Sequence, residues 1–169
     1  FDSISSKNTI EKIEKACVEV GFFQITGHNI SKKDISNITK VGNNFFNSSI
    51  KNKMKLAPKK WNRLNKNIYR GYFPNDVNGK EGLDIGDLRI TKKHLLKFKS
   101  QYIEFIELNR AINKKSISIL NKYFDQTFFL GEILFKSIIK LYKKNTDNSK
   151  FVFKRLKTLS TLRFNCYPK

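Results

Sequence analysis

Histidine, cysteine and acidic residues are scarce in this chain. Its 169 residues include 2 His, 2 Cys and 14 Asp or Glu. The two cysteines, Cys17 and Cys166, lack the close spacing of a metal-binding motif, and a chain of this length buries enough surface to fold without disulfides. We therefore expect two reduced thiols, as is usual for a cytoplasmic protein.

The chain also lacks long apolar runs. No stretch approaches the roughly 18 residues that a membrane-spanning helix needs, and the N-terminus has no basic-then-apolar signal pattern. Hydrophobic residues make up 39% and aromatic residues 13% of the chain, which is typical of a folded chain and not of a disordered one. The sequence thus predicts a cytoplasmic protein without a membrane partner.

Positive charge is abundant, because 34 Lys and Arg residues give a formal net charge of +20. Lys dominates this set, whereas nucleic-acid recognition relies strongly on the planar fork of Arg. The lysines are also spread along the whole chain. We interpret them as a solvated surface of biased composition and expect no specific nucleic-acid partner. A non-enzymatic basic module that binds RNA or DNA remains the alternative.

Apolar periodicity predicts a helix-rich α+β fold. Asn8 followed by Glu11 resembles a capping box that opens a first helix, and Gly21 suits its end. The aromatic and β-branched segment Phe22 to Thr26 favours a strand. Further helices are expected over 34–45, 51–56, 96–124 and 128–142, and further strands over 83–90 and 159–167.

Motifs at the two ends of the chain carry more specific information. The first is Gly-Phe-Phe-Gln-Ile-Thr-Gly-His-Asn-Ile at residues 21–30, and the second is Leu-Arg-Phe-Asn-Cys-Tyr-Pro-Lys at residues 162–169. Phe45-Phe46, Arg70-Gly71-Tyr72 and residues 80–86 lie between them. In this order the motifs resemble the isopenicillin N synthase-like family of non-haem iron oxygenases, most of which use 2-oxoglutarate. Asn29 replaces that family's usual Gly, and Asn tolerates the positive φ of such a turn.

The resemblance implies the N-terminal part of a jelly-roll (double-stranded β-helix) oxygenase. We expect residues 1–158 to form a non-haem dioxygenase N-terminal domain and residues 159–169 to form the first barrel strand. The chain begins at Phe1, and its one methionine is Met54. We interpret it as a fragment of a longer enzyme, truncated before the iron ligands.

The family holds its iron with two histidines and a carboxylate. This chain has only His28 and His94, and neither is followed two residues later by an acid. We therefore predict no metal ligand and no catalytic residue in it, and expect His28 to bond the backbone of its own turn. A catalytically inactive short relative, acting as an interaction protein, is a further alternative.

By resemblance, the full-length parent is a dioxygenase that uses Fe(II), 2-oxoglutarate and dioxygen. It would hydroxylate, desaturate or ring-close a small-molecule substrate. The chain itself is expected to bind no cofactor and to be inactive.

Four residues are candidates for binding roles in the parent. Asn165 and Tyr167 align with the Asn-x-Tyr element at which many family members hold 2-oxoglutarate, since a phenol can donate to a carboxylate. Alternatively, Tyr167 packs at the barrel wall and Asn165 ties backbone. Arg70 and Tyr72 align with a segment near the family's active-site mouth, which makes them candidates for the substrate entrance. An ordinary surface ion pair is the simpler interpretation of Arg70.

Overall fold

The computed structural model describes residues 6–75, 79–91, 93–94, 104, 106–142 and 160–167. The chain divides into two compact units. Phe1–Ser31 and Asp125–Phe153 form the first, and Lys32–Phe124 with Lys154–Lys169 form the second. The described elements are helices and one small sheet, so the expected α+β class is confirmed.

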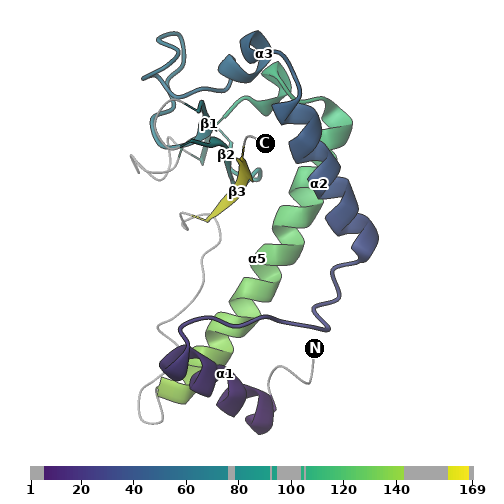
Figure 1. Cartoon of the computed structure of the whole chain (residues 1–169), viewed down its shortest axis with the longest axis vertical. Helices are drawn as coiled ribbons and strands as arrows, with labels where there is room; N and C mark the ends of the chain where they lie inside the picture. The colour runs from purple at the N-terminus through teal and green to yellow at the C-terminus, as the bar shows by residue number, and fades with distance from the viewer. Residues whose placement is uncertain are drawn as a thin grey trace. The chain divides into compact units, whose positions relative to one another are not determined.

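The sheet of the second unit joins segments that lie far apart in the sequence. Its strands β1 (Gly71–Phe73), β2 (Glu81–Gly86) and β3 (Thr161–Cys166) are antiparallel and lie in the order β1-β2-β3 (Figure 1). The strand predicted over 159–167 is confirmed for residues 161–166, while Leu159 lies outside the described residues. β2 begins two residues before the predicted strand and ends earlier, because the chain turns between Asp87 and Ile90.

Helix α2 (Lys32–Phe46) supplies part of the core of the same unit, and the short helix α3 (Ile50–Met54) follows it, with Met54 packed against that core. Helical spacing brings Ile38, Val41 and Phe45 of α2 to one buried face. The ring of Phe164 on β3 packs against this helix at Gly42, where an added Cβ would lie 2.8 Å from the ring. The other buried residues of this core are Leu56, Ala57, Tyr72, Leu83, Ile85, Leu108, Ile112 and Leu120.

Gly71 lets β1 pass close to the end of α3. Its φ is +116°, and a Cβ at this position would collide with the carbonyl oxygen of Leu56. The next residue, Tyr72, donates its backbone N–H to that same carbonyl oxygen at 3.1 Å. Only glycine combines this backbone conformation with this close approach.

In the first unit, α1 (Lys7–Glu19) is capped by Ser6 and not by Asn8 as expected. The Ser6 hydroxyl accepts from the N–H of Thr9 at 3.3 Å, which is the geometry of an N-cap. Asn8 already lies in the first turn. At the other end, Gly21 has a φ of +87° and donates its N–H to the Ala16 carbonyl at 2.9 Å, so the predicted helix end is confirmed.

The strand predicted over Phe22 to Thr26 does not form. Burial alternates along this segment, with Phe23 and Ile25 half-buried between exposed neighbours. A strand needs a neighbour to satisfy its backbone groups, and no strand pairs with this segment in the described ranges. The alternating pattern of a strand is therefore present in this segment, but the neighbouring strand that it would need is not found in the described ranges.

Helix α5 (Lys114–Tyr142) replaces the two helices predicted over 96–124 and 128–142. It begins later, because a 3₁₀ turn occupies Leu108–Arg110 and the Asn113 side chain accepts from the N–H of Ser116 at 2.8 Å. The expected break at residues 125–127 is absent because these polar residues include no Gly or Pro. Residues 96–103 lie outside the described part. No helix in that part is long and apolar enough to cross a membrane.

Candidate functional site

Strand β3 divides the side chains of the closing motif between two sides of the sheet. Leu162 and Phe164 are half-buried, whereas Arg163 and Asn165 are exposed, as the alternation of a strand requires. Tyr167 follows the strand and is 68% exposed. The two predicted co-substrate residues, Asn165 and Tyr167, thus both lie away from the core.

The surroundings of this pair are cationic and open. Asn165 lies opposite Gly82 in the strand register, so no side chain faces it from β2. The Nζ atom of Lys80 lies 5.7 Å from the centroid of the Tyr167 ring. Within the described ranges the side chains of Asn165 and Tyr167 make no hydrogen bond to the protein. The arrangement can receive an anionic group, and the assignment of these two residues to 2-oxoglutarate stays a prediction.

An ion pair joins β3 to β2 on the polar side of the sheet, which is the side that carries Arg163 and Asn165. Arg163 donates to both carboxylate oxygens of Asp84, from Nε to Oδ1 at 2.7 Å and from Nη2 to Oδ2 at 2.6 Å. Asp84 is buried and lies directly opposite Arg163 in the register. The hydrogen bond to Asp84, and then its charge, raise the pKa of Arg163. The sequence alone does not predict this pair, because the register of two distant strands cannot be read from either strand by itself.

Arg70 lies at one end of the same side of the sheet and is only 4% exposed. Its Nη2 donates to the carbonyl oxygen of Ser160 at 3.1 Å. Its guanidinium lies against Gly86, where an added Cβ would collide with it. The other terminal nitrogen, Nη1, is buried and has no hydrogen-bond partner among the described residues. Arg70 is therefore a packed element of the fold.

Three nearby carboxylates partly offset the effect of burial on the charge of Arg70. Burial lowers the pKa of Arg70, and the opposing effects of Glu104, Asp84 and Asp87 raise it in that order. Because a guanidinium keeps its proton in proteins, Arg70 remains a cation surrounded by carboxylates. The interpretation of Arg70 as an ordinary surface ion pair is wrong, since the side chain is buried. A substrate-entrance role stays a prediction that this burial does not support.

Glu104 connects to the backbone just before β1. Its carboxylate accepts from three consecutive N–H groups, those of Ile68, Tyr69 and Arg70, the last two at 2.9 Å each. Successive N–H groups aimed at one point form an anion-binding concavity. Here the carboxylate of Glu104 occupies this concavity.

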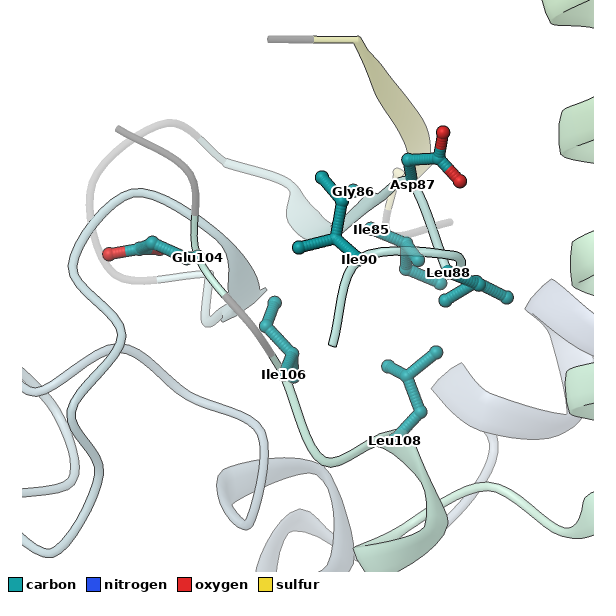
Figure 2. Close-up of a pocket in the computed structure, with 8 residues that line it drawn as sticks. All are labelled: Ile85, Gly86, Asp87, Leu88, Ile90, Glu104, Ile106 and Leu108. Carbon is teal, nitrogen blue, oxygen red and sulfur yellow. The ribbon is translucent and has the colours of Figure 1, made fainter. Parts of the chain in front are cut away.

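A small pocket lies beside these groups (Figure 2). Figure 2 shows Ile90, Ile106 and Leu108 around the same space, with Asp87 and Glu104 at its margins. Its volume is about 30 Å³, which suits one or two water molecules and is far below the several hundred Å³ of a small-molecule site. This pocket does not accommodate an organic substrate. The complete lining is Ile85, Gly86, Asp87, Leu88, Ile90, Glu104, Ile106 and Leu108.

Tyr72, the other predicted entrance residue, lies in the core and is 1% exposed. Its ring meets that of Phe45 edge to face at 5.8 Å, and the Nζ of Lys53 lies 5.4 Å from its centroid. Lys53 itself is buried and donates to both carboxylate oxygens of Glu81, at 3.0 and 2.7 Å. The entrance role of Tyr72 stays a prediction, and its placement favours packing.

The first unit contains a larger pocket of about 330 Å³. Four of its eight lining residues are apolar, and Lys12 is the one charged residue among them. No acid, base or nucleophile pair lines it, so it offers no catalytic chemistry of its own. The lining residues are Thr9, Lys12, Ile13, Phe23, Gln24, Ile25, Thr26 and Leu134.

The two histidines make local backbone contacts. His28 Nδ1 accepts from the N–H of Ile30 at 3.1 Å, which confirms the expected role in the turn. Asn29 has a φ of +57°, which confirms that Asn takes the conformation of the replaced Gly. His94 Nδ1 accepts from the N–H of Thr91 at 3.0 Å. No group of three His, Cys, Asp or Glu residues in the described ranges is placed to hold a metal, so these residues do not fit a resident iron.

Comparison with known families identifies the class of this chain. The family model described as non-haem dioxygenase in morphine synthesis, N-terminal, matches residues 1–116. This match covers more than half of the chain. The chain therefore belongs to the non-haem dioxygenase N-terminal family.

Two curated relatives match shorter segments. Protein DOWNY MILDEW RESISTANCE 6 of Arabidopsis thaliana is 40% identical over 58 residues, which are 32% of this chain and 17% of the relative. A probable iron/ascorbate oxidoreductase of Dictyostelium discoideum is 37% identical over 76 residues, 43% of this chain and 19% of the relative. The matched region thus spans less than a fifth of either relative. The matched family and the description of the second relative both indicate that the chain belongs to a family of oxidoreductases.

Proposed function

We propose that this chain is the N-terminal part of a non-haem iron, 2-oxoglutarate-dependent oxygenase that acts on a small molecule. The observation that carries this proposal is the family match over residues 1–116. The probable iron/ascorbate oxidoreductase among the relatives supports it. Bound iron would let dioxygen act as the oxidant for hydroxylation, desaturation or ring closure, with 2-oxoglutarate oxidised to succinate and carbon dioxide in the same turnover. Because the described residues do not fit the iron, we assign its ligands to a catalytic domain outside them.

We further propose that residues 159–169 open a jelly-roll barrel and that residues 1–158 form the accessory domain before it. Strand β3 supports this division, because it lies at the edge of its sheet. One side of β3 pairs with β2, and in the described ranges no strand pairs with the other side. Such an edge has unpaired backbone groups and favours the addition of a further strand.

In this proposal, Asn165 and Tyr167 bind 2-oxoglutarate. Their exposure on the polar side of β3 supports this role. A carboxylate near Tyr167 would accept a hydrogen bond from the phenol O–H and lie close to the cation of Lys80. The ion pair of Arg163 with Asp84 would hold β3 in register and so orient both side chains.

Turnover by the protein at its native length tests this proposal. The protein is isolated from its source, its mass is measured, and succinate formation from 2-oxoglutarate is followed with and without Fe(II). We expect Fe(II)-dependent succinate release. The 169-residue chain, assayed in parallel, should form no succinate and bind Fe(II) no better than a basic protein of similar charge. A native-length protein that consumes no 2-oxoglutarate would contradict the proposal and favour a non-catalytic interaction protein.

A further inference from the structure

Positive charge without any negative charge is concentrated in the segment from residue 51 to residue 70. Eight of its twenty residues are Lys or Arg, whereas the whole chain has 34 in 169 residues. No Asp or Glu occurs between Asp34 and Asp76. The cation density of this segment is thus twice the average of the chain, and no acid within the segment offsets it.

Most of these cations face water. Lys53 and Arg70 are buried in the ways described above. The segment from residue 51 to residue 70 is named here the basic loop. Its six exposed cations are Lys51, Lys55, Lys59, Lys60, Arg63 and Lys66. The neighbouring acid, Glu104, is occupied by the three backbone N–H groups at residues 68–70.

Three asparagine side chains hold the basic loop in one conformation. Asn62 donates to the carbonyl oxygen of Met54 at 3.0 Å. Asn65 donates to those of Lys55 and Ala57, at 3.1 and 2.6 Å. Its own Oδ1 accepts from Arg110 at 2.7 Å.

Asn67 completes this bracing from the far end of the loop. It donates to the carbonyl oxygens of Leu56 and Arg70, at 3.2 and 2.6 Å. The cations are thus presented by a braced loop, so little ordering entropy is lost when a partner binds.

Two aliphatic side chains and one tyrosine project from the same segment into solvent. Leu64 is 89% exposed, Ile68 59% and Tyr69 53%. Cations combined with exposed aliphatic residues are the composition of protein segments that lie at a lipid interface.

We propose that the basic loop is a peripheral docking surface for an anionic lipid bilayer. The cations would attract the headgroups, each contributing to binding near the surface, while Leu64 and Ile68 enter the boundary between headgroups and acyl chains. This contact goes beyond the catalytic proposal and does not depend on it. It revises the expectation that the protein has no membrane partner, and it requires no spanning helix.

The residues of the basic loop favour lipid over nucleic acid. Single-stranded nucleic acid is bound by aromatic stacking platforms and Arg, and Arg63 is the one exposed arginine of the loop. Trp61 is half-buried, its ring set edge to face against Phe73 at 5.6 Å. Lys60 Nζ lies 4.5 Å from the Trp61 centroid on the same ring. These contacts already occupy the indole ring of Trp61, which leaves Tyr69 as the exposed aromatic ring of the segment, without a second ring to form a stacking platform.

Vesicle sedimentation of the full chain tests the docking surface. The probes are vesicles of phosphatidylcholine alone and of phosphatidylcholine mixed with phosphatidylserine, each at low and at physiological salt. We expect retention only by the anionic vesicles. The triple variant Lys59→Gln, Lys60→Gln, Arg63→Gln should lower the partition coefficient roughly a hundred-fold, and Leu64→Asn about ten-fold at unchanged charge.

The matched control removes three exposed cations elsewhere: Lys32→Gln, Lys33→Gln, Lys40→Gln on α2. Circular dichroism melts check that every variant folds. An equal loss in both triple variants would mean that only net charge matters and would overturn the proposal. So would an unchanged Leu64→Asn variant, or the absence of retention by anionic vesicles. Loss of oligonucleotide binding in the loop variant, without vesicle binding by the parent chain, would assign the loop to nucleic acid instead.

Discussion

Arg163 of β3 donates two hydrogen bonds, of 2.7 and 2.6 Å, to the buried carboxylate of Asp84 on β2. Asp84 lies within the matched residues 1–116, whereas Arg163 lies beyond them. The ion pair therefore ties the closing motif to the family domain. A planar guanidinium bound at two points fixes orientation as well as distance, so this contact controls how β3 presents Asn165.

Removing the guanidinium should destabilise the second unit. Arg163→Gln leaves the buried Asp84 carboxylate without its partner, and we expect the free energy of unfolding to fall by about 1–3 kcal/mol. The Arg163 side chain is exposed to 61%, which keeps this value below that of a fully buried pair. Urea denaturation followed by circular dichroism measures it. Asn165→Ala, at the next exposed position of the same strand, is the control and should change stability by less than about 0.5 kcal/mol.

The sign of the pH effect follows from the raised pKa of Arg163. A cation whose pKa is raised in the folded protein stabilises it at every pH below its ordinary value, and this contribution is lost only as the pH rises through the raised value. The ion pair should therefore persist throughout the neutral and mildly alkaline range. A stability difference between the parent chain and Arg163→Gln that vanished there would contradict the assignment.

Two glycine-to-alanine changes should have opposite effects. At Gly86 the new methyl group meets the buried guanidinium of Arg70, and displacing it breaks the hydrogen bond to Ser160. We expect Gly86→Ala to destabilise the protein by about 1–3 kcal/mol. Gly131 lies within α5 with no heavy atom within 4 Å of an added Cβ. Gly131→Ala should stabilise by about 0.5–1 kcal/mol. Thermal melts of the two variants distinguish them. Unchanged or increased stability of Gly86→Ala would refute the packing of Arg70 on Gly86, and destabilisation by Gly131→Ala would refute the open space at Gly131.

The turn at residues 28–30 allows a test of backbone conformation alone. Asn29 has a φ of +57° and an exposed side chain, so Asn29→Gly should be neutral or slightly stabilising. Asn29→Val should cost about 1–2 kcal/mol, because a β-branched residue is strained in this region. Chemical denaturation of the two variants supplies the comparison. Equal stability of the Gly and Val variants would show that the turn does not need a positive φ.

Features that depend on neighbouring residues were predictable from the sequence. The Gly21 helix end follows from residues within a few positions. The contact of His28 with its own turn and the positive φ of Asn29 followed from the resemblance to the family's motif at residues 21–30. The alternation in residues 161–166 predicted β3. The order of the motifs along the chain, which matches that of a known family, then indicated that they belong to one domain. Local sequence patterns alone do not indicate this.

Features that depend on distant partners were missed. The pattern at Phe22 to Thr26 is that of a strand, but strand formation requires a second segment that no local pattern specifies. Arg70 was taken for a surface cation because nothing nearby in the sequence reveals that it packs on Gly86. Two helices were predicted over 96–124 and 128–142, whereas α5 continues through residues 125–127. These residues include no Pro or Gly that would end a helix.

The dependence of turnover on 2-oxoglutarate in the native-length protein, measured for the parent and for Tyr167→Phe, tests the central claim most directly. The phenol would donate to the co-substrate carboxylate, so its loss should raise the apparent KM for 2-oxoglutarate about ten-fold. The kcat should change little, because this bond is made equally in the ground and transition states. Tyr72→Phe, which alters a core tyrosine, is the control and should leave this KM unchanged. An unchanged KM in Tyr167→Phe, or a native-length protein that consumes no 2-oxoglutarate, would contradict the account.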